Sequence, residues 1–343
     1  MREREVPRPI TAADVARVAQ VSQSTVSLVL NGKWRGRIRE ATARRVMAAS
    51  SNLGYQINQA ARSLRLGGSG TVLLVVPTLE NAVFSTVHAG AARAGALHGL
   101  GVVVFPLGAE DGCGPFPVPK QSIDGVIACS MPAEAVADLS TGLPLVVLDD
   151  NPYAGAPTVS MDIGDGMANV LAHLTSLGHR HIAHVRADRP TWTFTHRAEV
   201  LNRCLLSHPG VTKDDVPCSL NARHVRDRAI HALSGPSRPT AVICDDDNLA
   251  TGVYYAAHEL GLTVGEDLSV VGFNDLPIST LLSPTLTTVR LPLTEMGFQG
   301  IQLFMEVCAG RTVKPLVLPT ELAVRESTAP PPSAERRPPD AAR

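Results

Sequence analysis

The sequence predicts a small all-α head joined to a larger α/β body, and three observations lead to this fold class. The 343 residues suffice for two or three domains, and 44% of them are hydrophobic, so the chain can build real cores. Residues 1–66 carry 12 Lys and Arg against 4 Asp and Glu, whereas the remaining residues carry 19 against 28. Helix-forming segments fill the basic part, and short apolar runs alternate with amphipathic segments in the acidic part.

This composition also limits the class of protein. A net charge of +8 on the first part and −9 on the rest is typical of a nucleic-acid-binding module attached to a domain with another role. No apolar run approaches the ~18 residues that a membrane span needs, and the N-terminus lacks the apolar stretch of a signal peptide. The six cysteines form no C-x-x-C pair. We therefore expect a cytoplasmic protein with no membrane partner, no disulfide framework and no metal or other cofactor.

The head begins after a charged arm, residues 1–9, which we expect to be disordered. Thr11 and Asp14 form a variant of the capping box, which starts a helix over residues 12–19. Ser22 can cap a second helix that runs to about Leu30. Two short helices joined by a short turn are thereby predicted.

The second helix is followed by Asn31 and Gly32, which tolerate the left-handed conformation that often ends a helix. A third helix is expected from about residue 39 to residue 53, rich in Ala, Arg and Met, and ending at Gly54. Residues 10–55 therefore read as a helix-turn-helix domain.

The second helix divides into two faces by its spacing. Val26, Val29 and Leu30 share an apolar face that can pack on the other helices. The opposite face carries Gln23, Ser24, Ser27 and Leu28, close to the helix N-terminus, where a helix-turn-helix presents side chains to the major groove. An ordinary exposed helix would look similar, but the surrounding positive charge favours DNA binding.

The body follows the flexible run Gly67 to Gly70 and reads as α/β. Its strand-length apolar runs are typical of parallel strands covered on both faces. These runs span residues 72–76, 102–105, 126–128, 145–148, 182–185, 241–244 and 269–273. Amphipathic segments between them, such as 84–97, 166–177 and 249–260, are long enough for crossover helices. The number of strands predicts two sheets with a cleft between them, followed by a disordered, proline-rich tail over residues 328–343.

The head contains the runs ITAADVARVAQVSQSTVSLVLN at 10–31, RRV at 44–46 and LGY at 53–55. Together they resemble the DNA-binding head of the LacI/GalR family of bacterial transcriptional regulators. The resemblance implies that Gln23, Ser24 and Leu28 read bases, and that Thr25, Ser27 and Asn31 contact phosphates. Tyr55 resembles the tyrosine that closes the head. Leu28 stands where the family commonly has Arg, so it can contact a thymine methyl group but cannot hydrogen-bond to guanine.

The run NQAARSLR at 58–65 is similar to the hinge helix of the same family, within a linker that we place at residues 56–68. The resemblance implies that Ala61 and Leu64 insert into the minor groove. Such a wedge costs a few kcal/mol of unstacking, which is repaid because the bent duplex contacts more protein. Ile57 replaces the proline that the family usually has there.

The resemblance continues through the body to Ser327, with the runs LGHRHIA at 177–183, SVVGFND at 269–275 and PTLTTV at 284–289. It implies a periplasmic-binding-protein-like effector and dimerisation domain over residues 69–327, built from two parallel-sheet subdomains. The N-subdomain is expected at about 70–160 and 291–318, and the C-subdomain at about 161–289 and 319–327.

The cleft of such a body binds the effector at the carboxyl ends of its strands. Carried over position by position, the resemblance implies six effector-binding residues: Asn81, Phe84, Asp149, Arg197, Asp247 and Asn274. Phe84 would stack on a ring, and the polar groups would bind hydroxyls or ring nitrogens of a sugar or nucleoside. Each polar residue also has a structural alternative, such as a helix cap or a turn.

Three departures bear on this site and its surroundings. Asn274 is an amide where the family usually has Asp, which disfavours a typical hexose, and we expect Asp275 to support its loop. Residues 105–123 hold four prolines and three glycines, so the usual second helix of the N-subdomain is expected to be missing or rebuilt as a loop. In the family this region lies close to the dimer interface, so the resemblance implies an altered dimer geometry and effector response.

Two residue patterns could suggest a metal site instead of regulation. His179, His181 and His184 are clustered and Asp245 to Asp247 are consecutive, but neither pattern has metal-ligand spacing. No G-x-S-x-G elbow or G-x-x-x-x-G-K loop is present, so the chain is not expected to be an enzyme. A cytoplasmic sugar-binding protein or sugar-acting enzyme with an accessory basic head is the alternative. The sequence favours a homodimeric repressor that binds a palindromic double-stranded DNA operator under effector control.

Overall fold

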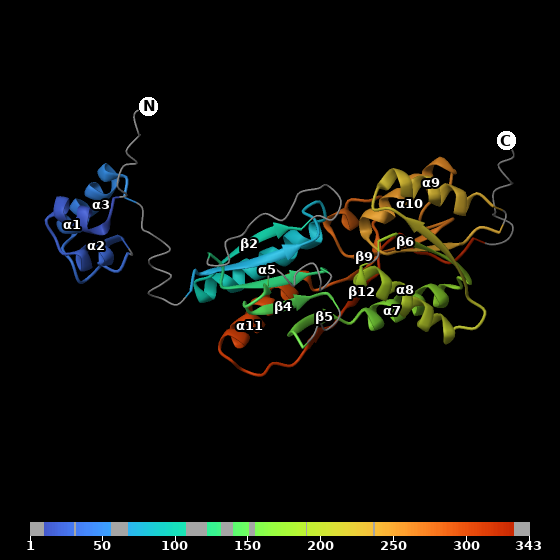
Figure 1. Ribbon diagram of the computed structural model, residues 1–343. Coiled ribbons are helices and arrows are strands. Elements are labelled where there is room, and N and C mark those ends of the chain that lie inside the picture. The colour runs from blue at the N-terminus through green and yellow to red at the C-terminus, as the bar shows by residue number, and fades with distance from the viewer. Residues whose placement is uncertain are drawn as a thin grey trace, which may run out of the picture. The chain divides into compact units, whose positions relative to one another are not determined.

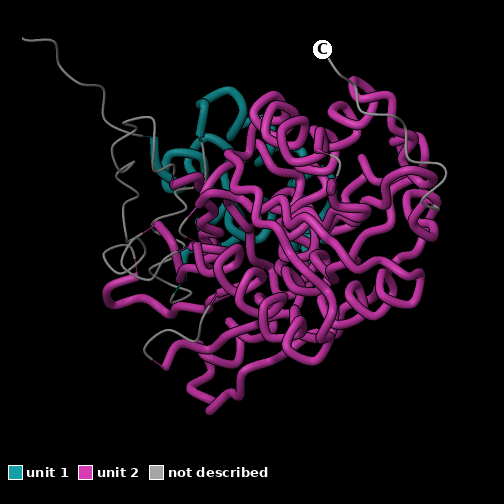
Figure 2. Tube along the Cα trace, turned by 90° about the vertical axis from the view of Figure 1, so that its right-hand side faces the viewer, with its two compact units in different colours: residues 1–69 teal, residues 70–343 magenta. Residues whose placement is uncertain are grey.

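The computed structural model describes residues 10–30, 32–55, 68–107, 122–131, 140–150, 155–189, 191–235 and 237–332. The chain divides into two compact units, residues 1–69 and residues 70–343, which Figure 2 colours separately. Within the described ranges, no helix is both long enough and apolar enough to cross a membrane. The arm at 1–9, Asn31, the hinge run at 58–65 and most of the segment 105–123 lie outside the described residues.

The first unit contains the three predicted helices, α1 (Ala12–Ala19), α2 (Gln23–Leu30) and α3 (Glu40–Leu53), seen in Figure 1. The predicted capping box is present, because the Thr11 hydroxyl accepts from the backbone N–H of Asp14 and the Asp14 carboxylate accepts from that of Thr11. Ser22 Oγ accepts from the backbone N–H of Thr25 at 3.2 Å and so caps α2.

The core of the head is made of small apolar side chains from all three helices. Val15 of α1, Val26 and Val29 of α2, and Val46 of α3 are each at most 3% exposed. Full burial of such a side chain contributes about 1.5–3 kcal/mol. This packing fixes which face of α2 points inward and leaves the opposite face to solvent.

The first sheet of the body has the strand order β11-β5-β4-β3-β1-β2, and every neighbouring pair is parallel. Its strands are β1 (Thr71–Val76), β2 (Gly101–Pro106), β3 (Gly125–Cys129), β4 (Leu145–Leu148), β5 (Thr158–Met161) and β11 (Leu316–Leu318). The helices α5 (Ala82–His98) and α11 (Leu293–Cys308) belong to this lobe and pack on each other.

Glycines allow α5 and α11 to approach backbone to backbone. A Cβ atom on Gly90 would overlap the backbone oxygen of Thr294, and one on Gly297 would overlap that of Val87. Neither position can hold a larger residue unless the two helices move apart. These two glycines therefore fix the distance between α5 and α11 in the first lobe.

The second sheet has the order β12-β10-β9-β8-β6-β7. Its strands are β6 (His181–Ala187), β7 (Thr212–Cys218), β8 (Ala241–Cys244), β9 (Ser269–Asn274), β10 (Thr287–Arg290) and β12 (Glu321–Ala323). Among the described strands, β10 and β12 form the one antiparallel pair. The helices of this lobe are α7 (Ile163–Leu177), α8 (Trp192–Leu206), α9 (Ala222–Leu233) and α10 (Asp247–Glu259), and the 3-10 helix η2 (Pro277–Thr280) follows β9.

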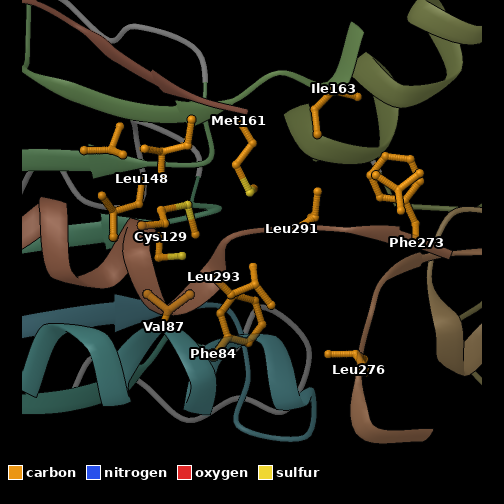
Figure 3. Packing of buried hydrophobic residues seen from close by; sticks show 14 of the residues in the cluster. Phe84, Val87, Cys129, Leu148, Met161, Ile163, Phe273, Leu276, Leu291 and Leu293 are labelled. Atoms are coloured by element: carbon orange, nitrogen blue, oxygen red, sulfur yellow. The ribbon is translucent and has the colours of Figure 1, made fainter. Parts of the chain in front are cut away.

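The predicted fold class is confirmed, and all seven predicted strand runs are strands. The chain passes between the two lobes three times: from β5 to α7, from β10 to α11, and from β11 to β12. Figure 3 shows Leu291 of the second passage and Leu293, the first residue of α11, between Phe84 of α5 and Phe273 of β9. One apolar cluster therefore continues through the junction of the lobes.

The predicted start of the disordered tail at Thr328 is wrong. Thr328 Oγ1 lies 2.9 Å from His173 Nε2, and the backbone N–H of Ala329 donates to Ser269 Oγ at 3.0 Å. The backbone oxygen of Ala329 lies 2.9 Å from Nε2 of the buried His179. Composition does not reveal these partners, because they come from helix α7, strand β9 and the turn between α7 and β6. Residues 333–343 lie outside the described residues.

Candidate functional site

The outward face of α2 carries amide and hydroxyl side chains, which suit hydrogen bonding to base edges. Gln23, Ser24 and Ser27 are exposed and Leu28 is half-buried, whereas Val26 and Val29 are buried. Thr25 is half-buried, and its hydroxyl lies 2.9 Å from Ser22 Oγ. Amide and hydroxyl groups can donate to and accept from base edges in the major groove.

The remaining DNA-contacting residues implied by the sequence are Asn31, Ala61 and Leu64. All three lie outside the described residues.

A cleft in the body brings together most of the predicted effector-binding residues. The open space of this cleft, which includes solvent at its mouth, is about 640 Å³. The wall contains apolar side chains from both lobes, among them Phe84 from α5, Phe194 from α8, and Leu291 and Leu293 from the passage between the lobes. The polar side chains in the lining are Thr78, Asn81, Ser130, Asp149, Arg189, Thr191, Thr193, Arg197, Asp246 and Asn274.

Arg197 is the buried cation of this cleft. It lies on α8 and is 3% exposed, and its guanidinium stacks over the Phe273 ring at 4.2 Å from the centroid. Its Nη2 donates to Asn274 Oδ1 at 3.1 Å, and its Nη1 donates to the backbone oxygen of Asp245. Nε has no hydrogen-bond partner among the described residues. A buried donor without a partner costs about 1–3 kcal/mol, so a ligand acceptor there would be stabilised.

Asp246 joins the two lobes across the cleft. It is the N-cap of α10, where its Oδ1 accepts from the backbone N–H of Asn248 at 2.7 Å. Its Oδ2 accepts from Asn81 of the first lobe at 3.0 Å and from Asn274 of the second at 2.8 Å. Burial raises the pKa of this carboxyl. Asn81 also caps α5 through its own Oδ1, so it is both a helix cap and part of the cleft.

Asp149 is a buried carboxylate in the lining of the cleft. It follows β4, is 4% exposed, and its Oδ2 accepts from Ser130 Oγ and Thr193 Oγ1, both at 2.9 Å. Its Oδ1 has no hydrogen-bond partner among the described residues. Burial raises the pKa of Asp149, and the nearby Arg197 opposes that shift. The free oxygen suits a ligand hydroxyl or N–H donor.

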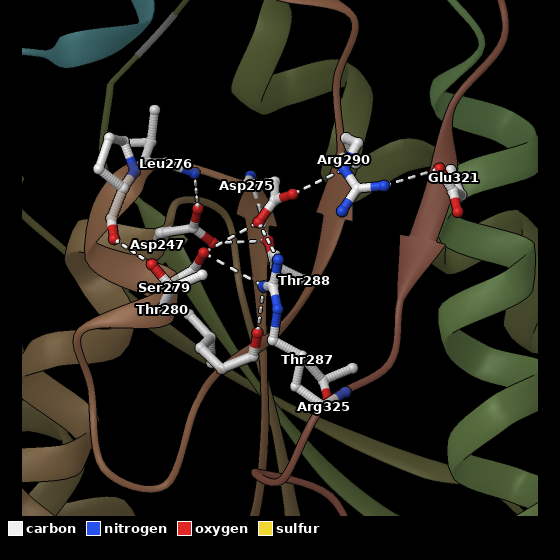
Figure 4. A network of polar contacts seen from close by, with 12 residues as sticks. Asp247, Asp275, Leu276, Ser279, Thr280, Thr287, Thr288, Arg290, Glu321 and Arg325 are labelled. Carbon is white, nitrogen blue, oxygen red and sulfur yellow. Dashed lines mark hydrogen bonds and ion pairs between the residues drawn. The ribbon is translucent and has the colours of Figure 1, made fainter.

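Asp247 does not line the cleft, and the expectation for this residue is corrected. Its Oδ1 accepts from Thr288 Oγ1 and its Oδ2 from the backbone N–H of Leu276, both at 2.6 Å (Figure 4). Burial raises the pKa of Asp247 to about 7. Adjacent residues at the start of a helix point in different directions, so Asp246 faces the cleft and Asp247 faces the loop after β9.

Asp275 supports this loop, as the sequence predicts. It accepts from Arg325 Nη2 at 2.6 Å, from Arg290 Nε at 2.7 Å and from Ser279 Oγ at 2.9 Å (Figure 4). Burial by itself raises the pKa of Asp275, but these donors outweigh burial and hold it below its usual value. The network fixes the chain directly after Asn274.

Ser130, Thr193 and Phe194 are cleft residues that sequence reasoning missed. Ser130 directly follows strand β3, so its position at a strand end was a usable signal. Thr193 and Phe194 lie in the first turn of α8, and nothing in their local pattern sets them apart.

Two of the clustered histidines each lie within hydrogen-bond distance of an aspartate. His184 Nε2 lies 2.8 Å from Asp245 Oδ1, and His181 Nε2 lies 2.7 Å from Asp214 Oδ2. Among the described residues, no three His, Cys, Asp or Glu side chains are arranged to hold a metal ion.

A three-helix head with a polar, exposed second helix and a two-lobed body with a polar cleft define a DNA-binding regulator with a small-molecule sensor. Comparison with known proteins agrees. Residues 11–58 match the sequence profile described as bacterial regulatory proteins, lacI family. Residues 171–328 match the profile of a periplasmic binding protein-like domain.

Full-length relatives extend this match over the whole chain. The HTH-type transcriptional regulator MalR of Streptomyces coelicolor is 33% identical, over 95% of this chain and 98% of MalR. The chain therefore belongs to the LacI family and is a DNA-binding transcriptional regulator, not an enzyme.

Solved structures of similar proteins agree with the fold. A lac repressor dimer bound to operator and the anti-inducer ONPF superposes with a TM-score of 0.79 at 26% identity, covering 94% of this chain and 100% of the other. A complex of the transcriptional regulator CelR with cellobiose gives a TM-score of 0.66 at 25% identity, covering 94% and 100%.

Proposed function

We propose that the protein is a cytoplasmic repressor that binds a palindromic operator as a homodimer and that a sugar-type effector in the cleft controls this binding. One observation carries the effector part of the proposal. The cleft combines apolar walls with a carboxylate oxygen on Asp149 and an N–H on Arg197 that have no hydrogen-bond partner in the described part of the chain. Dimeric operator binding is supported by the likeness to the lac repressor dimer, which is bound to its operator.

In this proposal the outward face of α2 reads one half-site in the major groove. Gln23 and Ser24 hydrogen-bond to base edges, and Leu28 contacts a thymine methyl group. Thr25, Ser27 and Asn31 bind phosphates and so set the position of the helix on the duplex. Because the reading face carries no charge, its contribution is specificity more than affinity.

The linker at residues 56–68 forms a hinge helix in each subunit. Ala61 and Leu64 enter the minor groove at the centre of the operator and bend the duplex. Two heads and two hinges together bury enough surface for a specific site, whereas one small head does not.

The ligand we propose is a sugar or sugar derivative other than a simple hexose, because the cleft has Asn274 where the family usually has Asp. A pyranose has apolar C–H faces and a rim of hydroxyls, and the cleft offers Phe84 for a face and Asp149 Oδ1 for a hydroxyl donor. Arg197 Nε is a donor for a ring or hydroxyl oxygen. The cellobiose bound by CelR supports this class. A nucleoside is the second candidate, favoured by the aromatic pair Phe84 and Phe194 in the lining.

The signal passes through the contact between the lobes. Asn81 and Asp246 hold the lobes together across the cleft, so a ligand that inserts there must replace or rearrange that bond. The ligand can shift the lobes only by its difference in affinity for the two arrangements. The hinge helices then order or melt with the placement of the N-subdomains.

Two experiments test the proposal. Selection of bound sequences from random DNA should recover an inverted repeat, and a selection without enrichment contradicts operator binding. Thermal melting of the full chain with cellobiose, lactose, maltose, ribose and nucleosides should then show a shift for one chemical class. A ligand that shifts melting should also change operator affinity, and a shift without that change contradicts effector control.

A further inference from the structure

The recognition helix α2 contains no charged residue, although its sequence lies in the basic part of the chain. The described head, residues 10–55 without residue 31, carries seven cations and two acids. Four of the seven cations lie in the segment that directly follows α2, at Lys33, Arg35, Arg37 and Arg39. We call residues 32–39 the basic loop.

Backbone hydrogen bonds and two half-buried side chains hold the basic loop in a defined conformation. Its backbone closes the end of α2, because Lys33 N donates to the Leu28 oxygen at 2.9 Å, and it turns again where Ile38 N donates to the Trp34 oxygen at 2.9 Å. Trp34 and Ile38 are half-buried and pack against the core of the head. Gly32 has φ +72°, which suits the left-handed turn after the helix.

The cations alternate with these two anchors and face solvent. Lys33, Arg35, Arg37 and Arg39 are all exposed, and the Arg35 guanidinium lies 6.0 Å from the centroid of the Trp34 ring. None of the four has an ion-pair partner among the described residues. The two acids of the described head pair with other cations: Asp14 with Arg17 at 3.0 Å, and Glu40 with Arg44 at 3.3 Å.

The cations at the end of the basic loop do not stabilise helix α3. Arg39 is the N-cap of α3 but makes no side-chain cap, and Arg37 lies two residues before it. Cations at the N-terminus of a helix face the positive end of its dipole. Unpaired cations that are unfavourable for the fold are expected where an anion binds from outside.

The length of α2 indicates that the anion bound by the basic loop is the phosphate backbone of DNA. Eight residues give a helix about 12 Å long, which is close to the width of the major groove of B-DNA at about 12 Å. With Gln23 and Ser24 at the base edges, the far end of α2 and the start of the basic loop reach the sugar-phosphate strand that borders the groove.

We propose that the basic loop binds backbone phosphates beside the half-site and supplies the electrostatic affinity that the uncharged recognition helix lacks. This inference rests on the proposed DNA binding by α2. The partner is the DNA backbone and not a base sequence, so the loop should act equally on any duplex.

The test uses the full chain and a short duplex of random sequence, with the dissociation constant measured between about 50 and 200 mM salt. Arg35→Gln and Arg37→Gln remove loop cations from exposed positions. Each lost phosphate contact should reduce the slope of log affinity against log salt by about 0.9 per head. Arg17→Gln is the matched control, because Arg17 is exposed on α1 and already paired with Asp14.

A reduced slope in both loop variants, with the wild-type slope in Arg17→Gln, supports the proposal. If the loop variants keep the wild-type slope, or if Arg17→Gln loses as much, the loop proposal is overturned while DNA binding by the head stands. If the wild-type chain does not bind the random duplex at low salt, DNA binding by the head and the loop proposal both fail.

Discussion

Replacing Asp247 with Asn should remove the contribution of this carboxyl to the pH dependence of folding of the body. In the native structure this carboxyl is buried between Leu276 and Thr288, and burial raises its pKa to about 7. The ordinary value for Asp is 3.8. An Asn side chain can keep both contacts, because its oxygen accepts from the Leu276 N–H and its amide can donate to the Thr288 hydroxyl.

The direction in which stability changes with pH follows from proton binding by Asp247. Between pH 5 and pH 8 the unfolded Asp247 is ionised, whereas the folded carboxyl holds a proton until the pH passes about 7. The native state therefore binds more protons, and the free energy of unfolding falls as the pH rises through this window. With about 1.36 kcal/mol for each pKa unit, the loss between pH 5 and pH 8 is about 2–3 kcal/mol.

Urea unfolding of wild type and Asp247→Asn at several pH values, followed by far-UV circular dichroism, measures this difference. The difference in unfolding free energy between the two proteins isolates Asp247 from the other titrating groups. We expect Asp247→Asn to gain about 2–3 kcal/mol relative to wild type on going from pH 5 to pH 8. A difference that does not change with pH would refute the assignment of Asp247 as a buried, largely protonated support of the loop.

Four further predictions concern the lobe, the cleft and the head. Gly297→Ala should cost about 1–3 kcal/mol in urea unfolding because its Cβ meets the α5 backbone, whereas Gly235→Ala, at an open position, should cost far less. Arg197→Lys keeps the charge but loses the forked geometry, so it should abolish the melting shift caused by the cognate effector while binding to random DNA stays unchanged; a retained shift would remove Arg197 from ligand binding. Gln23→Ala should alter the consensus recovered from random DNA, and an unchanged consensus would count against base reading. Leu64→Ala should weaken operator binding and leave non-specific binding nearly intact, and an equal loss of both would contradict the minor-groove wedge.

Local patterns were sufficient for the three helices of the head and for seven strands of the body. The capping box at Thr11 and the apolar runs of β1, β3, β8 and β9 depend on neighbouring residues, which the sequence displays directly. Strand β7 was missed because it is an edge strand with the polar sequence TKDDVPC and therefore lacks an apolar run.

The cleft was predictable only in part, because its geometry depends on long-range contacts. The family resemblance indicated both Asp149, which follows a predicted strand, and Arg197. The choice between Asp246 and Asp247 depends on which carboxylate is the N-cap of α10, and three consecutive aspartates do not settle that register. The unused oxygen on Asp149 depends on Ser130 and Thr193, which are distant in sequence and fill only one side of the carboxylate.

The backbone contact between α5 and α11 determines how this regulator can move. Two helices that touch without intervening side chains have little room to move apart or together, so we expect this helix pair to move as one rigid unit. Any rearrangement that starts in the cleft is then taken up by the three short chain passages between the lobes. Small rotations at those passages would then displace the end of the first lobe that lies farthest from the cleft.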